Sequence, residues 1–151
     1  MSIPKAMDNA HYRKLESFYL NANLNKEIFY NTEIEISNQK AIIKMPIAPK
    51  YFHALGAIHG FTYFKMLDDA AFFAAQSIEE DLMVLTANFN LHFTKPASSG
   101  NLLAKGSVKS ATKGIIYAQS TLYNEKGETI AFGQGSFVKS KTQLKSSPLY
   151  R

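Results

Sequence analysis

Residues 57–77 read AIHGFTYFKMLDDAAFFAAQS, and this stretch decides the fold. It is rich in Ala, Phe, Met and Leu, and it has no proline and no glycine after Gly60. On a helix its apolar side chains cover nearly the whole circumference, which is typical of a helix buried on most of its faces. Because it also holds Lys65, Asp68 and Asp69, it is a poor candidate for a membrane span. The pattern predicts one long buried helix over 57–77.

Shorter periodic segments precede this helix. Residues 8–22 predict an amphipathic helix with Asp8 as its N-cap. Its apolar stripe is expected to consist of Tyr12, Leu15, Tyr19 and Leu20. Residues 33–36 and 41–47 predict two short strands that flank a tight turn.

Four β-like runs follow the long helix. They are residues 82–94, 102–111, 114–124 and 128–139. The breaks between them are short and rich in turn residues, so consecutive runs are expected to pair antiparallel. A curved sheet that wraps an apolar helix buries both hydrophobic surfaces at once. We therefore expect an α+β fold in which a curved antiparallel sheet surrounds one long central helix, with an additional N-terminal helix. Residues 1–139 form the expected single domain, and 140–151 a basic tail that is extended or loose.

The composition is that of a globular domain. The chain has 151 residues, of which 46% are hydrophobic and 19% charged, which is enough to form a core. It has no cysteine, which excludes disulfide frameworks, thiolate metal sites and cysteine nucleophiles. The N-terminal sequence MSIPKAMDNAHYRK has no apolar segment, and the chain has no run of about 18 uncharged apolar residues. We therefore expect no signal peptide, no membrane span and a cytoplasmic location.

The net charge of +5 favours an anionic partner such as nucleic acid, phospholipid or a phosphorylated small molecule. A solvated basic surface is the alternative explanation. Four of the basic residues lie close to the C-terminus: Lys139, Lys141, Lys145 and Arg151. The sequence has no RNP-type aromatic motif, zinc finger or helix–turn–helix signal, so nucleic acid is not an expected partner.

Asp68 is the candidate for chemistry within the long helix. At helical spacing it falls in an apolar stripe between Phe61 and Ala75. Burial of an unpaired carboxylate raises its pKa, and such a group is a candidate general base or nucleophile. Alternatively, Asp68 pairs with a lysine or caps a backbone amide. Asp69 lies four residues after Lys65, which an exposed i,i+4 ion pair explains.

His59 and Gly60 open the long helix. Glycine lets a ligand approach the backbone closely, and the free N–H groups of a helix start can stabilise negative charge on a carbonyl oxygen. An ordinary helix start explains the same residues. Residues 132–137 read FGQGSF inside a predicted strand, which indicates a bulge or a close backbone approach. The histidines form no compact metal pattern, and GxSxG and P-loop motifs are missing. No metal and no cofactor are expected.

Three segments together resemble the PaaI type of hotdog-fold acyl-CoA thioesterases. GAIHGFTYFKMLDDAAFFAA, residues 56–75, is similar to the family's signature of HGG, a helix and an Asp. VLTANFNLHFTKPASSGNLLAKGSV, residues 84–108, resembles its next strand pair. YNEKGETIAFGQGSFV, residues 123–138, resembles its closing hairpin. The resemblance covers residues 30–139 and implies the hotdog fold, in which a sheet wraps a helix.

The resemblance implies roles for four residues. Asp68 would be the catalytic carboxylate, either as general base on water or as nucleophile on the thioester carbonyl. The backbone N–H of Gly60 would hold the thioester oxygen, and His59 would help to order the site. Thr86 matches a hydroxyl position that places the water or the acyl group. In such enzymes the carboxylate and the oxyanion donor belong to different subunits, so a homodimer or a dimer of dimers is expected.

Two residues depart from the family pattern. Phe61 stands where the second glycine of HGG is expected, so its ring is expected to narrow or block the acyl pocket. His53 stands where relatives commonly have Asn, and it can still donate a hydrogen bond while titrating near neutral pH.

The resemblance further implies a set of CoA contacts. These are Ser110, Ala111, Thr112 and Lys113 in one loop, with Phe93 along the pantetheine path. Lys113 is the expected phosphate contact.

The sequence thus predicts a hydrolase that releases CoA from a small or medium acyl-CoA, with Asp68 and Gly60 as its central groups. The alternative is a non-catalytic hotdog protein that binds acyl-CoA or lipid, in which Phe61 has ended turnover. A hotdog dehydratase acting on acyl-carrier-protein substrates fits less well. That chemistry needs a histidine paired with an acidic residue, and Asp68 has no such partner in register.

Overall fold

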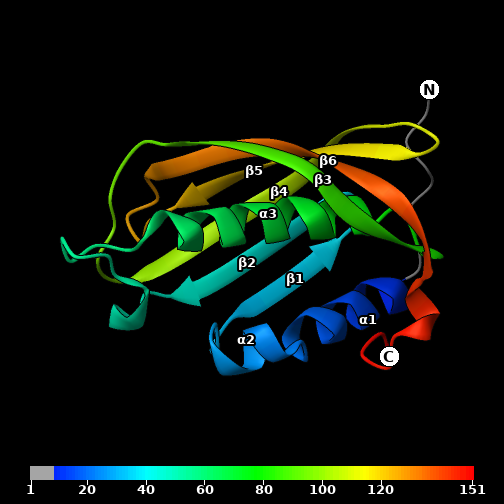
Figure 1. Cartoon of the computed structure of the whole chain (residues 1–151), viewed down its shortest axis with the longest axis horizontal. Coiled ribbons are helices and arrows are strands. Elements are labelled where there is room, and N and C mark those ends of the chain that lie inside the picture. Colours follow the sequence, from blue (N-terminus) through cyan, green and yellow to red (C-terminus); the bar gives the residue numbers. More distant parts are fainter. Residues whose placement is uncertain (1–8) are drawn as a thin grey trace.

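The computed structural model describes residues 9–151, so the expected N-cap Asp8 lies outside the described residues. Two short helices come first, then two strands, one long helix and four strands (Figure 1). The elements are α1 (Asn9–Leu20), α2 (Asn23–Glu27), β1 (Glu33–Ser37), β2 (Lys40–Pro46), η1 (Pro49–Tyr51), α3 (Gly60–Gln76), β3 (Leu82–Phe93), β4 (Asn101–Ala111), β5 (Ile115–Tyr123), β6 (Thr129–Gln143) and η2 (Leu144–Ser146).

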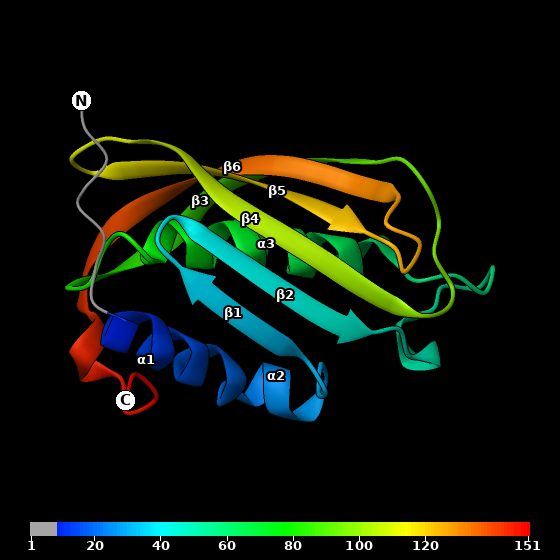
Figure 2. The ribbon, with the colours of Figure 1, turned by 180° about the vertical axis from the view of Figure 1, so that it is seen from behind.

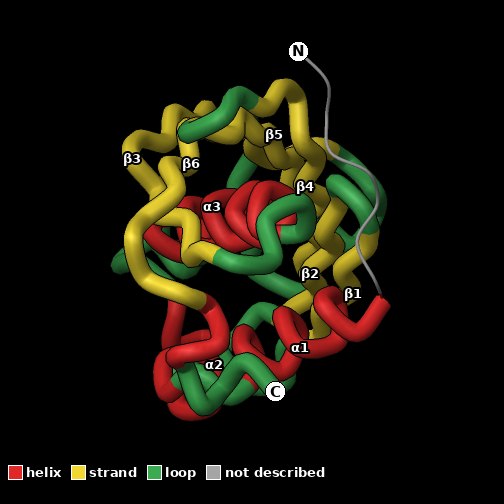
Figure 3. Tube along the Cα trace, turned by 90° about the vertical axis from the view of Figure 1, so that its right-hand side faces the viewer, coloured by secondary structure: helices red, strands yellow, loops and turns green. Residues whose placement is uncertain are grey.

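The six strands form one antiparallel sheet in the order β1-β2-β4-β5-β6-β3. Seen end-on, the sheet curves around α3, which lies on its concave side (Figure 3). The view from behind shows the opposite face of the sheet without a covering helix, while α1 and α2 lie beside β1 (Figure 2). The predicted α+β architecture is therefore confirmed, but the expected pairing of the consecutive runs β3 and β4 is wrong, because β3 crosses to the far edge of the sheet and pairs with β6. Within residues 9–151, no helix is both long and apolar enough to cross a membrane.

The long helix starts at Gly60, three residues later than predicted. Ile58 is held in an isolated antiparallel bridge with Phe52, so the chain is still extended there. His59 then caps the helix, because its Nδ1 accepts a hydrogen bond from the N–H of Phe61 at 3.0 Å. His59 and Gly60 open the helix, as predicted, but residues 57 and 58 precede it and are not part of it.

The C-terminal segment is packed rather than loose. β6 continues to Gln143, and Leu144 is almost completely buried. The hydroxyl of Tyr150 lies 2.7 Å from Nδ1 of His11, which joins the end of the chain to α1. The expectation of an extended or loose segment over 140–151 holds for the extension of β6 to Gln143, but the sequence did not predict that Leu144 and Tyr150 anchor the rest.

The N-terminal helix places its apolar stripe largely as predicted. Tyr12, Leu15 and Tyr19 are buried against the core. Leu20 is exposed and does not join the stripe, since α1 ends at this residue.

Close approach of α3 to the sheet depends on small residues. Four alanines of the helix are fully buried: Ala70, Ala71, Ala74 and Ala75. On β4, a Cβ atom at Gly106 would lie 2.1 Å from the carbonyl oxygen of Ala70. On β5, the hydroxyl of Ser120 donates to the carbonyl of Leu67 at 2.7 Å. Glycine at position 106 therefore sets how near the helix can lie.

The glycines of FGQGSF also mark a close backbone approach, as predicted. A Cβ at Gly133 would lie 2.4 Å from the carbonyl oxygen of Asn90. A Cβ at Gly135 would lie 2.6 Å from that of Asn88. The β3–β6 ladder is therefore tight along its middle.

The side chain of Gln76, the last residue of α3, fixes where β3 begins. It is fully buried, and its Nε2 donates to the carbonyls of Glu79 at 2.8 Å and Leu82 at 2.9 Å. Its Oε1 accepts from the N–H of Val84 at 2.8 Å. This clamp fixes the register of β3 against α3, and so determines which β3 side chains face the helix.

We expect Gly106→Ala to destabilise the fold by about 1–3 kcal/mol, because the added methyl group would force α3 away from β4. Urea unfolding should show a lower midpoint with an unchanged slope. Gly114→Ala is the matched control, since its Cβ would meet no heavy atom within 4 Å beyond its chain neighbours. Equal midpoints for the two variants would contradict the close helix–strand packing.

Candidate functional site

The candidate site lies on the side of α3 that the sheet leaves open. Phe61 and Phe64, one turn apart on this side, are 50% and 40% exposed. Asp68 follows on the next turn and is partly buried. The apolar stripe predicted around Asp68 is therefore real, and it runs beside β3, where Phe64 packs against Phe89 at 5.7 Å between ring centroids.

Asp68 has one hydrogen-bond partner in its surroundings, the hydroxyl of Thr86. Thr86 lies on β3 and donates to Oδ1 of Asp68 at 2.9 Å. Burial raises the pKa of Asp68 to about 6; the Thr86 hydrogen bond and nearby Lys65 lower it, while nearby Asp69 raises it. Neither a lysine ion pair nor a capped backbone amide explains the carboxylate. Instead, it is a partly desolvated acid held by a neutral hydroxyl.

Asp69 forms the predicted ion pair with Lys65, but this pair is not exposed. The side chains of Asp69 and Lys65 are only 23% and 12% exposed. The ammonium group of Lys65 also lies over the rings of Tyr19 and Phe29, at 5.1 and 4.7 Å from their centroids. The prediction of an exposed pair is wrong, because α1 and the segment after α2 cover this flank of α3.

A cavity of about 330 Å³ adjoins the Asp68–Thr86 pair. Its walls come from α1, α2, α3 and β3. Its lining is formed by Phe18, Tyr19, Ala22, Leu24, Asn25, Lys65, Asp68, Asp69, Phe72, Phe73, Met83, Leu85 and Thr86. A carboxylate with a raised pKa in a mainly apolar hollow is typical of an active site.

Gly60 lies at the other end of the open side, where α3 begins. The N–H groups of its two successors bond to His59: Phe61 to the ring at 3.0 Å and Thr62 to the carbonyl at 3.0 Å. The N–H of Gly60 itself has no hydrogen-bond partner in the part of the chain that the structure describes. It is therefore available to a ligand, at the end of the helix that favours negative charge.

A second cavity, of about 390 Å³, lies beside Gly60. It is lined by His53, Ile58, Gly60, Tyr63, Phe93, Thr94, Lys95 and Pro96. The ring of Phe93 covers Gly60, since a Cβ there would lie 3.2 Å from its Cζ. Lys95, which forms an ion pair with Glu128, brings a cation to this cavity. Sequence reasoning identified His53, Gly60 and Phe93 but missed Lys95, which no motif distinguished from other lysines.

His53 and His59 stabilise the backbone next to them in the chain. Nδ1 of His53 accepts from the N–H of Leu55 at 3.1 Å, much as His59 caps α3. His92 lies on β3 against the ring of Phe132. Among residues 9–151, no three His, Asp or Glu side chains lie close enough together to hold a metal ion.

Gly60 and Asp68 cannot share one substrate within a single chain. They are eight residues apart on a continuous helix, which at 1.5 Å per residue separates them by about 12 Å along the axis. Each has its own cavity. Within one chain, therefore, a single thioester group does not reach both Gly60 and Asp68.

Phe61 does not fill either cavity. Its ring lies against His59 at 5.2 Å and Phe29 at 6.2 Å between centroids, and it is not part of either lining. Within one chain the half-exposed ring lies along the open side, and its expected narrowing or blocking of the acyl pocket stays a prediction.

The residues expected to contact CoA, 110–113, are scattered by the fold. Ala111 is buried in the core beneath the sheet and offers no side-chain surface to a ligand. Thr112 closes the β4–β5 turn through two hydrogen bonds with Ile115, at 3.0 and 3.1 Å. Lys113 is exposed at the tip of this turn. The side chain of Ala111 points into the core, and the expected contact of this loop with CoA stays a prediction.

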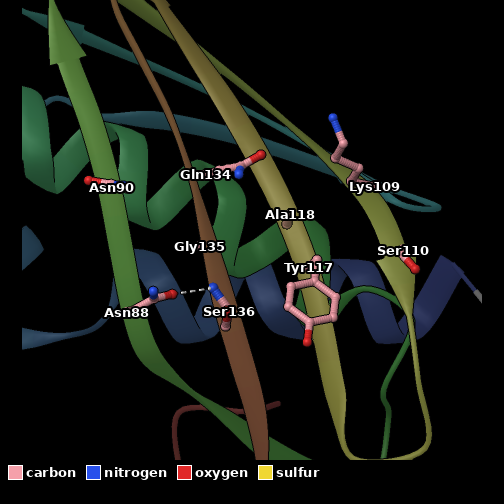
Figure 4. A pocket seen from close by; sticks show the side chains of 9 residues that line it. All are labelled: Asn88, Asn90, Lys109, Ser110, Tyr117, Ala118, Gln134, Gly135 and Ser136. Carbon is pink, nitrogen blue, oxygen red and sulfur yellow. Dashed lines mark hydrogen bonds between the residues drawn. The ribbon is translucent and has the colours of Figure 1, made fainter.

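Ser110 instead lines a shallow polar hollow of about 370 Å³ on the face of the sheet away from α3 (Figure 4). Lys109 and Ser110 lie on one side of it, and Asn88 on the other. The side chain of Asn88 accepts from the N–H of Ser136 at 3.1 Å. The lysine in this hollow is Lys109, whereas Lys113 lies at the tip of the neighbouring turn.

Comparison with known families supports the resemblance seen in the sequence. The family model described as the thioesterase superfamily matches residues 55–131, which include Gly60, Asp68 and Thr86. No curated protein matches the chain by sequence.

Several solved structures share the fold. The PaaI protein of E. coli, from the phenylacetic acid degradation operon, has a TM-score of 0.80 at 18% identity, over 89% of this chain and 96% of its own. A thioesterase of Haemophilus influenzae has a TM-score of 0.75 at 15% identity, over 93% and 95%. A Streptococcus mutans protein bound to acetyl CoA has a TM-score of 0.69 at 16% identity, over 76% and 92%. The predicted hotdog fold is therefore confirmed.

We expect Thr86→Val to raise the pKa of Asp68 above its present value of about 6, because the hydroxyl that stabilises the carboxylate is lost. Titration of the Asp68 carboxyl carbon by NMR measures this directly. Thr86→Ser keeps a hydroxyl and should leave the titration close to that of the wild type. If the valine and serine variants titrate alike, Thr86 does not hold the carboxylate.

Proposed function

Because this chain belongs to the thioesterase superfamily, whose model matches residues 55–131, and is thus a hydrolase of thioester bonds, we propose that it releases CoA from small or medium acyl-CoA substrates. The observation that carries the proposal is the desolvated Asp68 carboxylate beside an apolar cavity. The acetyl CoA held by the Streptococcus mutans protein of the same fold supports the substrate class.

Asp68 is the proposed general base. With a pKa of about 6, it is mostly ionised at neutral pH yet basic enough to accept a proton from water. The water oxygen bonds to the thioester carbonyl carbon while Asp68 takes the proton. The C–S bond then breaks, the carboxylic acid leaves, and the thiolate of CoA takes up the proton from Asp68, which restores the carboxylate. In the direct-attack variant the carboxylate of Asp68 bonds to the carbonyl carbon, the C–S bond breaks to release the thiolate of CoA, and water then hydrolyses the mixed anhydride.

The N–H of Gly60 from a second copy is the proposed oxyanion donor. A partner-free N–H at a helix N-terminus stabilises the negative charge that develops on the carbonyl oxygen. Lys95 lines the cavity beside Gly60 and provides positive charge for the phosphates of CoA. The contribution of Lys113 to phosphate binding stays a prediction.

Pairing of two copies is supported by the β3 edge and the open side of α3. β3 is a 12-residue edge strand that pairs only with β6, so its outer backbone groups are open to another strand. Leu85 and Phe93 on this strand are more than half exposed. If a twofold axis passed beside Phe64, the α3 helices of the two copies would lie antiparallel to each other. Since Phe64 lies midway between Gly60 and Asp68, each Gly60 would then face the partner's carboxylate.

We expect Asp68→Asn to lower kcat by about 10²–10⁴-fold, because the amide cannot accept the proton of the attacking water. For the wild type, kcat/KM should rise up to about pH 6 and level off above it, following ionisation of Asp68. CoA release from a panel of acyl-CoAs, followed with a thiol reagent, measures both.

The effect of Asp68→Asn on folding stability has a defined direction, which serves as the folding control. Since the folded-state pKa of Asp68 is raised, its ionisation destabilises the wild type as pH rises through about 6. The variant should therefore melt at or above the wild-type temperature at pH 8. Unchanged turnover in Asp68→Asn would contradict the base assignment. A wild type that binds acyl-CoA without releasing CoA would favour the non-catalytic alternative.

We expect two inactive variants to restore activity when mixed. Gly60→Pro removes the N–H at the first position of α3, where proline fits a helix, and the extended φ and ψ of His59 suit a following proline. When Gly60→Pro and Asp68→Asn chains are unfolded together and refolded, each mixed dimer should contain one intact site. Activity should recover to about a quarter of the wild-type level for random pairing. No recovery, with both variants dimeric, would contradict a shared site.

A further inference from the structure

We propose that the cavity beside Asp68 holds the acyl chain, that it selects an uncharged chain, and that Ala22 sets the chain length. This proposal rests on the proposed function, because it takes Asp68 to be the group beside the thioester carbonyl. It goes further by assigning substrate selection to the N-terminal helices, which lie outside residues 55–131 matched by the family model.

The walls of the cavity are built from aromatic and aliphatic side chains that support one another. Phe73 lies at its centre, with ring centroids at 5.3 Å from Tyr19, 6.4 Å from Phe18 and 5.1 Å from Phe72. Met83 on β3 also contributes to the lining. A preformed apolar wall of this kind binds alkyl chains without first having to order itself.

The charges on the wall are unsuited to a charged chain. Apart from Asp68, the charged side chains that line the cavity are Lys65 and Asp69, and they pair with each other. Asp69 also accepts a hydrogen bond from the hydroxyl of Tyr19. A carboxylate or ammonium on the ligand would lose its hydration and find no free counter-charge. The selection is therefore for chain length and shape.

The two cavities differ in a way that matches the two ends of an acyl-CoA. The hollow beside Asp68 is mainly apolar, whereas the hollow beside Gly60 includes Lys95 and His53. In a site made from the Asp68 side of one copy and the Gly60 side of another, the thioester lies between them. The acyl chain then continues into the apolar hollow, while the phosphate-bearing end leaves past the cation.

Ala22 is placed to limit how far the chain can enter. It is the N-cap residue of α2, in an extended conformation, and it lines the cavity where α1 passes into α2. Its methyl group is the smallest side chain in that lining. A larger residue there would fill part of the cavity without removing any of the existing packing.

Binding of S-alkyl-CoA thioethers tests the subsite without requiring turnover. For the wild type, calorimetry with S-ethyl-, S-hexyl- and S-decyl-CoA should show affinity rising about threefold or more for each methylene that enters the cavity. Ala22→Phe should bind S-ethyl-CoA within about twofold of the wild type but lose at least tenfold for S-decyl-CoA. Ala22→Leu should lose less, and it tests the idea independently if the larger ring impairs folding.

Asn23→Phe is the matched control, because Asn23 is the exposed neighbour of Ala22 and does not line the cavity. Its chain-length profile should equal that of the wild type. The proposal is overturned if affinity does not rise with chain length, as when a partner's side chain fills the cavity, or if both Ala22 variants keep the wild-type profile. Thioester hydrolysis is measured separately. Length-dependent thioether binding without hydrolysis would reject the proposed hydrolase while retaining the subsite.

Discussion

A helix that is apolar nearly all round must be covered nearly all round, and one curved sheet covers only part of it. In this protein the sheet covers the side of α3 that carries the small residues, where Gly106 lies against the backbone of Ala70. The N-terminal helices cover a second flank around Lys65 and Asp69. What remains open is the row that contains Phe61, Phe64 and Asp68. The candidate site is this uncovered remainder.

Asp68 lies at the edge of the covered surface of α3, and this partial burial accounts for its chemistry. Complete burial would neutralise the carboxylate, and full exposure would leave it an ordinary acid. Partial burial, countered by the Thr86 hydroxyl, leaves the pKa at about 6. The hydroxyl is in place because Gln76 clamps the start of β3, two residues before Thr86. A buried amide at the end of α3 thus determines the environment of a carboxylate two turns earlier.

The same covering problem connects the fold with association. The open row of α3 lies beside β3, since Phe64 packs against Phe89 and Asp68 bonds to Thr86, and β3 forms a free edge of the sheet. Both the row and the edge present apolar side chains to solvent. A second copy placed there would cover the aromatic rings and pair the strand edges in one step. Within one chain, Gly60 and Asp68 are about 12 Å apart along the helix. The second copy would bring the Gly60 of one chain to the Asp68 of the other. Stability and function then favour the same arrangement.

The sequence by itself determined the long helix, the succession of strands along the chain and the unusual acid at position 68, but not that β3 pairs with β6. These depend on hydrophobic periodicity and turn residues, which are local properties. Only the tertiary structure decided which side of α3 stays open, that Thr86 is the partner of Asp68, that Lys65 and Asp69 are covered, and that residues 140–144 are anchored. It also placed Lys95 beside Gly60 and turned Ala111 into the core. Such outcomes depend on contacts between residues far apart in the chain, and no short segment carries that information.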